Sequence, residues 1–360
     1  MMGILSIFHK SESVLGVDVG SSSLKLLELD LSGKVPRVVN FAYSQLSTDI
    51  ITNNFVTNLS VVGEQLSSLL ESNSISTKTA ALAVPGPSVF IKKIKMPKAN
   101  QDELERNIQV EAASFIPHNI DAIKLDFHVL GEVAKGQLEV LVVAVKNEIM
   151  QSYTDAVALG GLEPAVVDVD YFALQNAFER TQLEESQSKT VALVNIGAKY
   201  TAVNIIKGTH SLFTGDISVG GKNMTDGLAS DLGISSKDAE EKKRASNKTE
   251  QVTEAFQKQC DHFASELNRQ LSFFWNASAA DDGIETIVLS GAPASNVQLV
   301  KAIASKTGIN TVVFDPFEGI DISGVKDLQK LKELAPAFAV VTGLALRSPG
   351  DKESFVVSEQ

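Results

Sequence analysis

The chain has 360 residues, of which 44% are apolar and 21% charged, so it can bury a sizeable core as two domains or one large composite fold. Its net charge of −12 is spread along the sequence and argues against a nucleic-acid-binding protein, which normally carries a basic face. The single cysteine, Cys260, excludes a disulfide framework and suits a reducing cytosol, and five scattered histidines argue against a zinc site.

Neither end of the sequence predicts a membrane anchor. No apolar run approaches the ~20 residues of a membrane span. Residues 2–8 are apolar but lack a basic leader and a small-residue cleavage site, so we expect them to tuck against the body as an arm or edge strand. A soluble, intracellular protein is expected.

The first predicted unit is an apolar strand, a turn and a second apolar strand over residues 14–29. The turn, GSSS at residues 20–23, follows Asp18 and precedes Lys25. Small residues leave backbone N–H groups free to converge, which suits an anion such as phosphate. A tight β-hairpin whose serines satisfy turn hydrogen bonds has the same pattern, and this stretch alone does not decide between them.

The rest of the first half alternates strands and helices. The apolar patterns predict a third strand over 34–46, a helix from Phe55 and strands within 79–97 that a Pro-Gly-Pro interrupts. A helix capped by Asn100 and Glu103 follows, and then a hairpin of 124–132 with 138–146. The last predicted elements of this half are a helix around 149–159, a strand over 164–170 and a helix from Tyr171. The polar residues 182–189 are the best linker candidate.

The second half repeats the first in outline. Residues 191–206 are again strand, turn and strand, and a third strand follows from His210. Superposing the two openings pairs Asp18 with Asn195 and Gly20 with Gly197, which indicates an internal duplication. Two facing turns can hold one polyphosphate from opposite sides, and closure of the two halves then excludes water.

Two further segments carry weaker signals. Residues 285–308 predict a buried strand, a Ser-Gly-Ala turn and a helix starting near Asn296. The small residues of this turn would let a flat ring or a phosphate approach the backbone. An ordinary strand-to-helix turn has the same pattern. One face of a predicted helix carries Glu240, Lys243 and Arg244. This face is either part of a ligand site or a run of charges exposed to solvent.

Taken in order, these segments resemble the superfamily of actin, sugar kinases and heat-shock chaperones. Residues 16–29 and 193–206 resemble its two phosphate loops and residues 289–300 its adenosine loop. Within the superfamily, nearly the whole chain resembles the PilM family of type IV pilus assembly, a relative of the FtsA division proteins. The stretches that carry this resemblance are 115–131, 138–178 and 217–235.

The resemblance implies an α/β protein with the actin-like ATPase fold, in which two duplicated lobes surround a nucleotide cleft and one lobe carries a small inserted α/β domain of the SHS2 type. The implied domains are 1–86, first lobe; 87–163, insertion; 164–190, return to the first lobe and connection; 191–222, second-lobe core; 223–283, its outer subdomain; 284–334, second-lobe core with the adenosine loop; and 335–360, a return helix and tail.

The resemblance also implies ATP or ADP as a ligand, with Mg²⁺ held through its water shell by Asp18. The implied nucleotide-binding residues are Gly20, Ser21, Ser22, Ser23, Lys25, Asn195, Gly197, Ala198, Gly221, Glu240, Lys243, Arg244, Gly291 and Ala292. Asp168 and Asp170 are the candidates for orienting a water molecule, or alternatively cap the helix that follows them.

One residue departs from the superfamily pattern. The second phosphate turn normally begins with aspartate, and here Asn195 holds that place. An amide brings no negative charge to hold Mg²⁺ or orient a nucleophile, and positioning and electrostatics supply nearly all of phosphoryl transfer. ATPase activity is therefore expected to be weak or absent while binding survives.

The expected function is a cytoplasmic, nucleotide-binding scaffold of the type IV pilus assembly platform, peripheral to the inner membrane. It would dock the cytoplasmic N-terminal segment of a PilN-like membrane protein and contact other pilus assembly proteins. It could also form homo-oligomers, and no binding of nucleic acid is expected. An FtsA-like division protein is one alternative, but the acidic residues 351–360 do not read as a membrane-seeking helix. A sugar or small-acid kinase is the other, and the sequence offers no firm general base for it.

Overall fold

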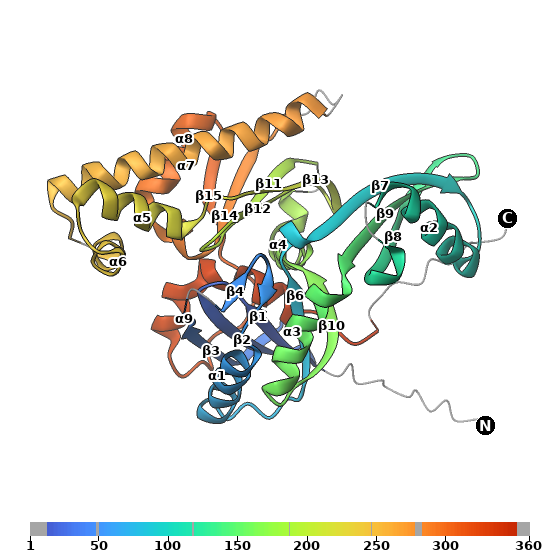
Figure 1. The fold of residues 1–360 in the computed structure, drawn as a ribbon, viewed down its shortest axis with the longest axis horizontal. Helices are drawn as coiled ribbons and strands as arrows, with labels where there is room; N and C mark the ends of the chain where they lie inside the picture. The colour runs from blue at the N-terminus through green and yellow to red at the C-terminus, as the bar shows by residue number, and fades with distance from the viewer. Residues whose placement is uncertain are drawn as a thin grey trace.

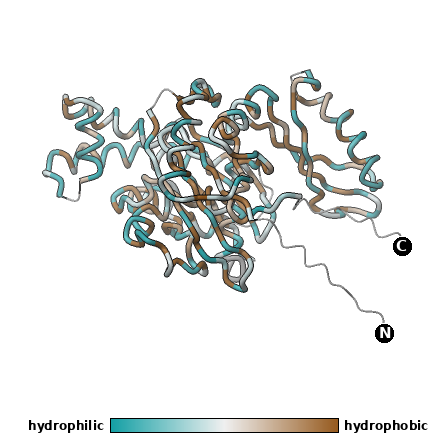
Figure 2. The backbone as a smooth tube through the Cα atoms, turned by 90° about the horizontal axis from the view of Figure 1, so that it is seen from below, coloured by the Kyte–Doolittle hydropathy of each residue, from teal (hydrophilic) through white to brown (hydrophobic). Residues whose placement is uncertain are grey.

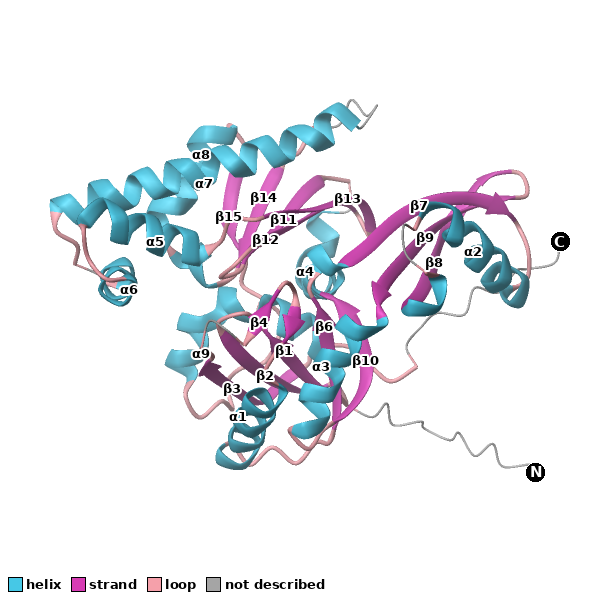
Figure 3. Cartoon of the chain, viewed as in Figure 1, coloured by secondary structure: helices cyan, strands magenta, loops and turns pink. Residues whose placement is uncertain are grey.

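Two five-stranded sheets with the same topology organise the chain (Figures 1 and 3). The computed structural model describes residues 13–47, 50–116, 119–186, 188–245, 247–277 and 283–350. The first sheet has the order β3-β2-β1-β6-β10, with β1 (Leu15–Val19), β2 (Ser23–Asp30), β3 (Arg37–Gln45), β6 (Thr79–Val84) and β10 (Glu163–Val169). The second has the order β13-β12-β11-β14-β15, with β11 (Thr190–Ile196), β12 (Thr201–Lys207), β13 (His210–Ile217), β14 (Thr286–Ser290) and β15 (Asn310–Val313).

The two sheets confirm the predicted duplication. In each, three antiparallel strands are followed by two strands parallel to the first. The first turn of each is also closed by the same bond: the Gly20 N–H donates to the Ser23 carbonyl and the Gly197 N–H to the Tyr200 carbonyl, each at 3.0 Å. We refer to the part of the chain built on the first sheet as the first lobe and to that built on the second as the second lobe.

Helices α1 (Leu59–Ser72) and α3 (Asn147–Leu159) cover the outer face of the first sheet and share its core. The Asn58 side chain accepts the Val61 N–H and caps α1. Phe55, predicted to lie in this helix, instead forms β5 (Phe55–Val56), which pairs with β4 (Ile51–Thr52). The prediction was wrong there because the apolar spacing continues across the cap.

The second sheet is covered by α5 (Gly221–Leu232), α7 (Glu250–Ala277) and α8 (Val297–Thr307), with α6 (Ser236–Arg244) beyond α5. Buried side chains of α7 such as Phe256, Phe263 and Leu267 fill the core under these helices. The Asn296 side chain accepts the Gln298 and Leu299 N–H groups, so the predicted start of this helix is confirmed.

Two helices lie between the sheets and join the lobes. Helices α4 (Asp170–Ser186) and α10 (Ala339–Ala345) contribute to one core with strands of both sheets. They cross so closely that a Cβ on Gly343 would lie 1.7 Å from the Ala173 carbonyl oxygen. The predicted linker at 182–189 was wrong as far as Ser186, because Gln, Leu and Glu sustain the helix there; residue 187 lies outside the described residues.

A third sheet is inserted between β6 and α3 and projects to the right in Figure 1. Its order is β7-β9-β8, with β7 (Val89–Pro97), β8 (Ile123–Ala134) and β9 (Gln137–Lys146), and α2 (Gln101–Phe115) packs on it. The Asn100 side chain accepts the Glu103 N–H and caps α2, as predicted. The predicted hairpin within this segment is also confirmed.

Short elements complete the chain: η1 (Gly86–Ser88), η2 (Ile120–Ala122), η3 (Ala292–Ser295), α9 (Leu328–Leu334) and η4 (Ala335–Phe338). Hydrophobic residues are concentrated in the central strands, while hydrophilic and hydrophobic positions alternate along the peripheral helices (Figure 2). Among the described helices, none has the length and hydropathy to cross a membrane. The expectations for residues 2–8 and 351–360 fall outside the described residues.

Candidate functional site

A cleft of about 550 Å³ lies between the lobes, where the two duplicated turns face each other. Residues 18–23 line it from the first lobe and residues 195–200 from the second. Of the predicted site residues, the cleft brings together all except Asp168: Asp18, Gly20, Ser21, Ser22, Ser23, Lys25, Asp170, Asn195, Gly197, Ala198, Gly221, Glu240, Lys243, Arg244, Gly291 and Ala292.

The first turn carries an aspartate and a lysine side by side. Asp18 and Lys25 are paired across β1 and β2, and their carboxylate and ammonium groups lie 2.7 Å apart with 19% and 11% of the side chains exposed. A Cβ on Gly20 would lie 3.1 Å from the Ser23 carbonyl oxygen, so the turn has no room for a larger residue without adjustment. Ser21, Ser22 and Ser23 line this end of the cleft with small hydroxyl side chains.

The second turn is tied to the start of α5. The Gly221 N–H donates to the Gly197 carbonyl at 2.8 Å and the Lys222 N–H to the Ala198 carbonyl at 2.9 Å. A Cβ on Gly197 would lie 2.8 Å from the Tyr200 carbonyl oxygen, and one on Gly220 would lie 2.6 Å from the Ala198 carbonyl oxygen. The backbone is packed so tightly that only glycine fits at both places.

Gly291 forms the third wall, directly after β14. Its φ of +88° lies in the left-handed region, and a Cβ there would lie 2.2 Å from the Ile196 carbonyl oxygen. The Gly291 N–H donates to the Pro336 carbonyl at 2.7 Å. The missing side chain lets this turn pack directly on the Ile196 backbone, and Gly291 and Ala292 together line this part of the cleft.

Helix α6 contributes a network of charges to the far end of the cleft. The Glu240 carboxylate accepts from Lys243 at 2.6 Å, from Arg244 at 2.7 Å and from the Thr225 hydroxyl at 2.5 Å. Burial opposes its ionisation, but the hydrogen bonds from Lys243, Thr225 and Arg244 outweigh burial and lower the pKa of Glu240 to about 2. The predicted face of α6 is thus an ordered polar surface, and Thr225, missed in the sequence, helps to fix it.

Asp170 lies at the start of α4 and faces both lobes. Its carboxylate accepts the Gly86 N–H at 2.9 Å and the hydroxyl of Tyr200, which comes from the second lobe, at 2.5 Å. Burial raises the pKa of Asp170 to about 7, against the opposing effect of these hydrogen bonds, and the nearby charge of Asp18 adds to the rise. The hydrogen bond from Tyr200 to Asp170 could not be predicted from the sequence, in which Tyr200 is distinguished only by its place at the end of the second turn.

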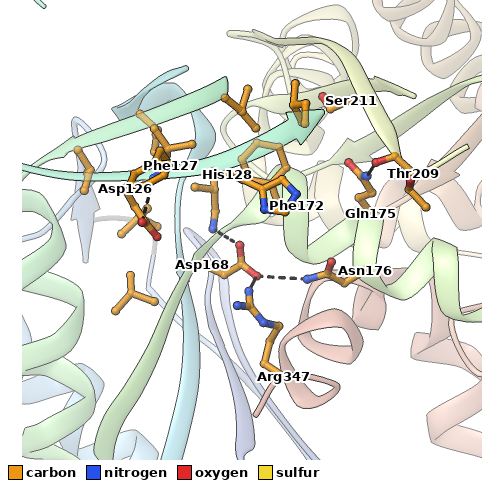
Figure 4. Close-up of a pocket in the computed structure, with 18 of the residues that line it drawn as sticks. Asp126, Phe127, His128, Asp168, Phe172, Gln175, Asn176, Thr209, Ser211 and Arg347 are labelled. Atoms are coloured by element: carbon orange, nitrogen blue, oxygen red, sulfur yellow. Dashed lines mark hydrogen bonds and ion pairs between the residues drawn. The ribbon is translucent and has the colours of Figure 1, made fainter. Parts of the chain in front are cut away.

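Asp168 lies in a different cavity, so the expectation that it acts beside Asp170 is not supported by the geometry. Figure 4 shows its carboxylate between Arg347, with which it forms an ion pair, and the amide of Asn176, which donates to it at 3.3 Å. The two acids point to different sides because β10 ends at Val169 and the helix begins at Asp170, which breaks the alternation of a strand.

The cavity that holds Asp168 is a groove of about 1620 Å³ between the inserted sheet and α4 (Figure 4). Strand β8 lines one side with residues 124–130, and α4 lines the other with residues including Phe172, Gln175 and Asn176. Among the described strands, β8 pairs only with β9, so it is an edge strand of its sheet. The groove therefore combines a strand edge, apolar side chains and charged groups.

Two solved structures resemble this chain over most of its length. A PilM-PilN type IV pilus biogenesis complex matches with a TM-score of 0.82 and 26% sequence identity, over 93% of this chain and 98% of that chain. The ethanolamine utilization protein EutJ from Carboxydothermus hydrogenoformans matches with a TM-score of 0.56 and 13% identity, over 92% of this chain and 89% of that chain.

These similarities and the duplicated sheets confirm the actin-like ATPase fold expected from the sequence. The family model of type IV pilus assembly protein PilM matches residues 16–349, which include both lobes and the inserted sheet. The chain therefore belongs to the PilM family of type IV pilus assembly proteins.

Proposed function

We propose that this protein is a nucleotide-binding scaffold of the type IV pilus assembly platform. It binds ATP or ADP with Mg²⁺ in the cleft between the lobes, and it docks the cytoplasmic N-terminal segment of a PilN-like inner-membrane protein in the groove beside the inserted sheet. The observation that carries the proposal is the likeness, over nearly the whole chain, to a PilM-PilN complex. The family match supports the role in pilus assembly.

The residues of the cleft fit a nucleotide. Two facing turns, closed by the same hydrogen bond, offer backbone N–H groups and the hydroxyls of Ser21, Ser22 and Ser23 to phosphate oxygens. Lys25 supplies a point charge there, and the small residues Gly291 and Ala292 would form the wall against which a flat ring lies. Glu240, Lys243 and Arg244 form the polar surface that would contact adenine and ribose.

The carboxylates also fit Mg²⁺. This ion keeps most of its waters and usually contacts one or two carboxylates together with the phosphates. Asp18 lines the cleft beside the first turn, and its charge acts on Asp170 across the same cavity. A cation near these two acids would relieve their repulsion. Mg²⁺ would neutralise phosphate charge, whereas Asp18 would hold and orient its water shell.

Hydrolysis is expected to be slow or absent for two reasons. Asn195 brings no charge to the place that corresponds to Asp18, and its side-chain oxygen accepts a hydrogen bond from Ser290 at 3.3 Å. Asp170, the remaining candidate for orienting a water molecule, is already bonded to Tyr200 and the Gly86 N–H. Asn195→Asp should raise any measured rate of phosphate release. An equal or lower rate in a folded variant would show that Asn195 does not limit turnover.

The groove suits an extended peptide. The edge strand of a sheet can pair with an added strand, and neighbouring pockets then select its side chains. Strand β8 supplies the edge, Phe172 supplies an apolar contact, and Lys124 and Asp126 supply charges. Docking a membrane protein's cytoplasmic segment here would hold the protein peripheral to the inner membrane, where other pilus assembly proteins or a second copy of this chain could join it.

Two binding measurements test the proposal separately. Millimolar ATP with Mg²⁺ should raise the melting temperature, since a ligand at about 100 times its Kd stabilises a protein by about 2.7 kcal/mol. Asp18→Ala should weaken Mg²⁺-dependent binding more than metal-free binding and leave peptide binding intact. An unchanged melting temperature with ATP would refute the nucleotide site.

The peptide is tested by calorimetry with a synthetic PilN N-terminal segment. Asn176→Arg places a long charged side chain in the groove, so it should abolish peptide binding while the response to ATP persists. Undiminished binding by this variant would refute the groove as the docking site. No binding by the intact protein would refute the partner.

A further inference from the structure

The two duplicated turns differ in their charged residues at matched positions. Matching Gly20 with Gly197 places Asn195 where the first lobe has Asp18 and Lys199 where it has Ser22. At these two places the first lobe has a formal charge of −1, which Lys25 compensates by pairing with Asp18, and the second lobe has a formal charge of +1. Because the backbones of the turns correspond, this difference is a property of the side chains alone.

Lys199 reaches across the cleft. Its ammonium donates to the carbonyl oxygen of Ile51, which lies in β4 of the first lobe, and the contact is partly buried. Within the described part of the chain, Lys199 forms no ion pair with an aspartate or glutamate. An ammonium has three donors, and a partly buried charge satisfied by a single neutral carbonyl remains attractive to an anion.

The other cations of the cleft are paired with a carboxylate or exposed. Lys25 pairs with Asp18, and Lys243 and Arg244 both pair with Glu240. Lys222 likewise pairs with an aspartate, and Lys237 is exposed at the start of α6. Lys199 thus differs from them in combining partial burial, a contact across the cleft and a neutral partner.

We propose that Lys199 is a ligand for the terminal phosphates of the bound nucleotide and replaces part of the charge that Mg²⁺ supplies. The inference rests on the proposed nucleotide function and adds to it a specificity: the cleft prefers nucleotides with more phosphates, and it holds them with a reduced need for metal. Relative to the first turn, the second turn has an uncharged Asn195 in place of an aspartate and a positively charged Lys199 in place of a serine. Both differences favour the binding of an anion over a cation at the second turn.

The variant Lys199→Met tests this inference, since it keeps the length of the side chain and removes its charge. The matched control is Lys242→Met, which removes a charge from exposed α6 outside the cleft. Affinities for ATP, ADP and AMP are measured by calorimetry with Mg²⁺ and again with EDTA. The melting temperature of each variant establishes that it is folded.

For the unaltered protein, we expect EDTA to weaken ATP binding by less than tenfold. Lys199→Met should weaken ATP binding by tenfold or more in EDTA, weaken ADP binding less, and leave AMP binding within twofold. Lys242→Met should leave all three within twofold. The graded effect is the signature of a phosphate ligand.

Two results would overturn the inference while the nucleotide function stands. One is unchanged ATP affinity of Lys199→Met in EDTA. The other is an equal loss for ATP, ADP and AMP, which would show that Lys199 acts only through its bond to Ile51 and the closure of the lobes. If the unaltered protein binds none of the three nucleotides, the proposed function itself fails.

Discussion

Gly291 shows how one residue sets the shape of the cleft. Any side chain there must accept both a φ of +88° and a Cβ 2.2 Å from the Ile196 carbonyl oxygen. Gly291→Ala should therefore lower the free energy of unfolding by about 3 kcal/mol, and urea titration measures this change.

Gly324→Ala is the matched control. Nothing lies within 4 Å of a Cβ at Gly324, so this substitution should change the free energy of unfolding by less than about 1 kcal/mol. Equal stability of the two variants would show that the backbone at Gly291 relaxes freely and does not fix the wall of the cleft.

Asp170 predicts a dependence of stability on pH. Since burial raises its pKa from 3.8 to about 7, the folded protein keeps the proton that the unfolded chain loses above pH 4. The contribution of Asp170 to stability therefore falls as the pH rises from about 4 to 7, and the full penalty remains above that range. The facing groups are Asp18 and the hydroxyls of Tyr153, Tyr171 and Tyr200, and these tyrosines do not titrate in that range.

Asp170→Asn removes this penalty. Relative to the variant, the unaltered protein should lose on the order of 2 kcal/mol of unfolding free energy between pH 5 and pH 8. Urea titrations of both proteins at the two pH values measure the difference, in which the other titrating groups cancel. A difference that does not change with pH would contradict the buried, protonated state of Asp170.

At the scale of elements, the inserted sheet can be removed at a natural closure point. Val89 in β7 pairs with Val145 in β9, so a short turn can replace residues 90–144. The deletion must stop before α3, because Tyr153, Ala156 and Val157 of that helix belong to the core of the first lobe. The boundaries predicted at 87 and 163 remain predictions.

The shortened protein should fold, retain the response of its melting temperature to ATP, and lose binding of the PilN N-terminal peptide. The physical reason is that the deletion removes β8 from the groove and leaves both turns of the cleft in place. Calorimetry with peptide and with ATP reads both properties in one preparation. Peptide binding by the shortened protein would show that α4 and the first sheet suffice.

At the scale of the whole molecule, a ligand held by both turns should stabilise each lobe. Cys260 on α7 reports on the second lobe, because it is buried and burial raises the pKa of its thiol to about 12. Its reaction with a thiol reagent should be at least about a thousandfold slower than that of a free cysteine, since the lobe must open first.

Adding ATP with Mg²⁺ should slow this reaction further, by the factor that corresponds to the ligand's stabilisation of the closed protein. The labelled fraction is followed by mass spectrometry, and guanidine-unfolded protein gives the unprotected rate. Rapid labelling of the native protein would contradict the buried position of Cys260. An unchanged rate with saturating ATP would show that the ligand does not couple to the second lobe.

The sequence by itself determined the features that depend on neighbouring residues. Apolar strands around a glycine turn predicted both halves of the duplication, and Asn100 and Asn296 predicted the starts of α2 and α8, because a cap acts on N–H groups two or three residues away. The spacing of Glu240, Lys243 and Arg244 likewise predicted a shared helix face. These signals are local, so they can be recognised in the sequence without knowledge of the tertiary structure.

Only the tertiary structure decided which residues far apart in the sequence meet. Tyr200 meets Asp170 from 30 residues away, Lys199 meets the Ile51 carbonyl from 148 residues away, and Arg347 meets Asp168 from 179 residues away. Such pairs follow from the packing of α4 and α10 between the two sheets, and no spacing in the sequence encodes them. The separation of Asp168 from Asp170 has the same origin, because the end of β10 and the start of α4 send two nearby acids into different cavities.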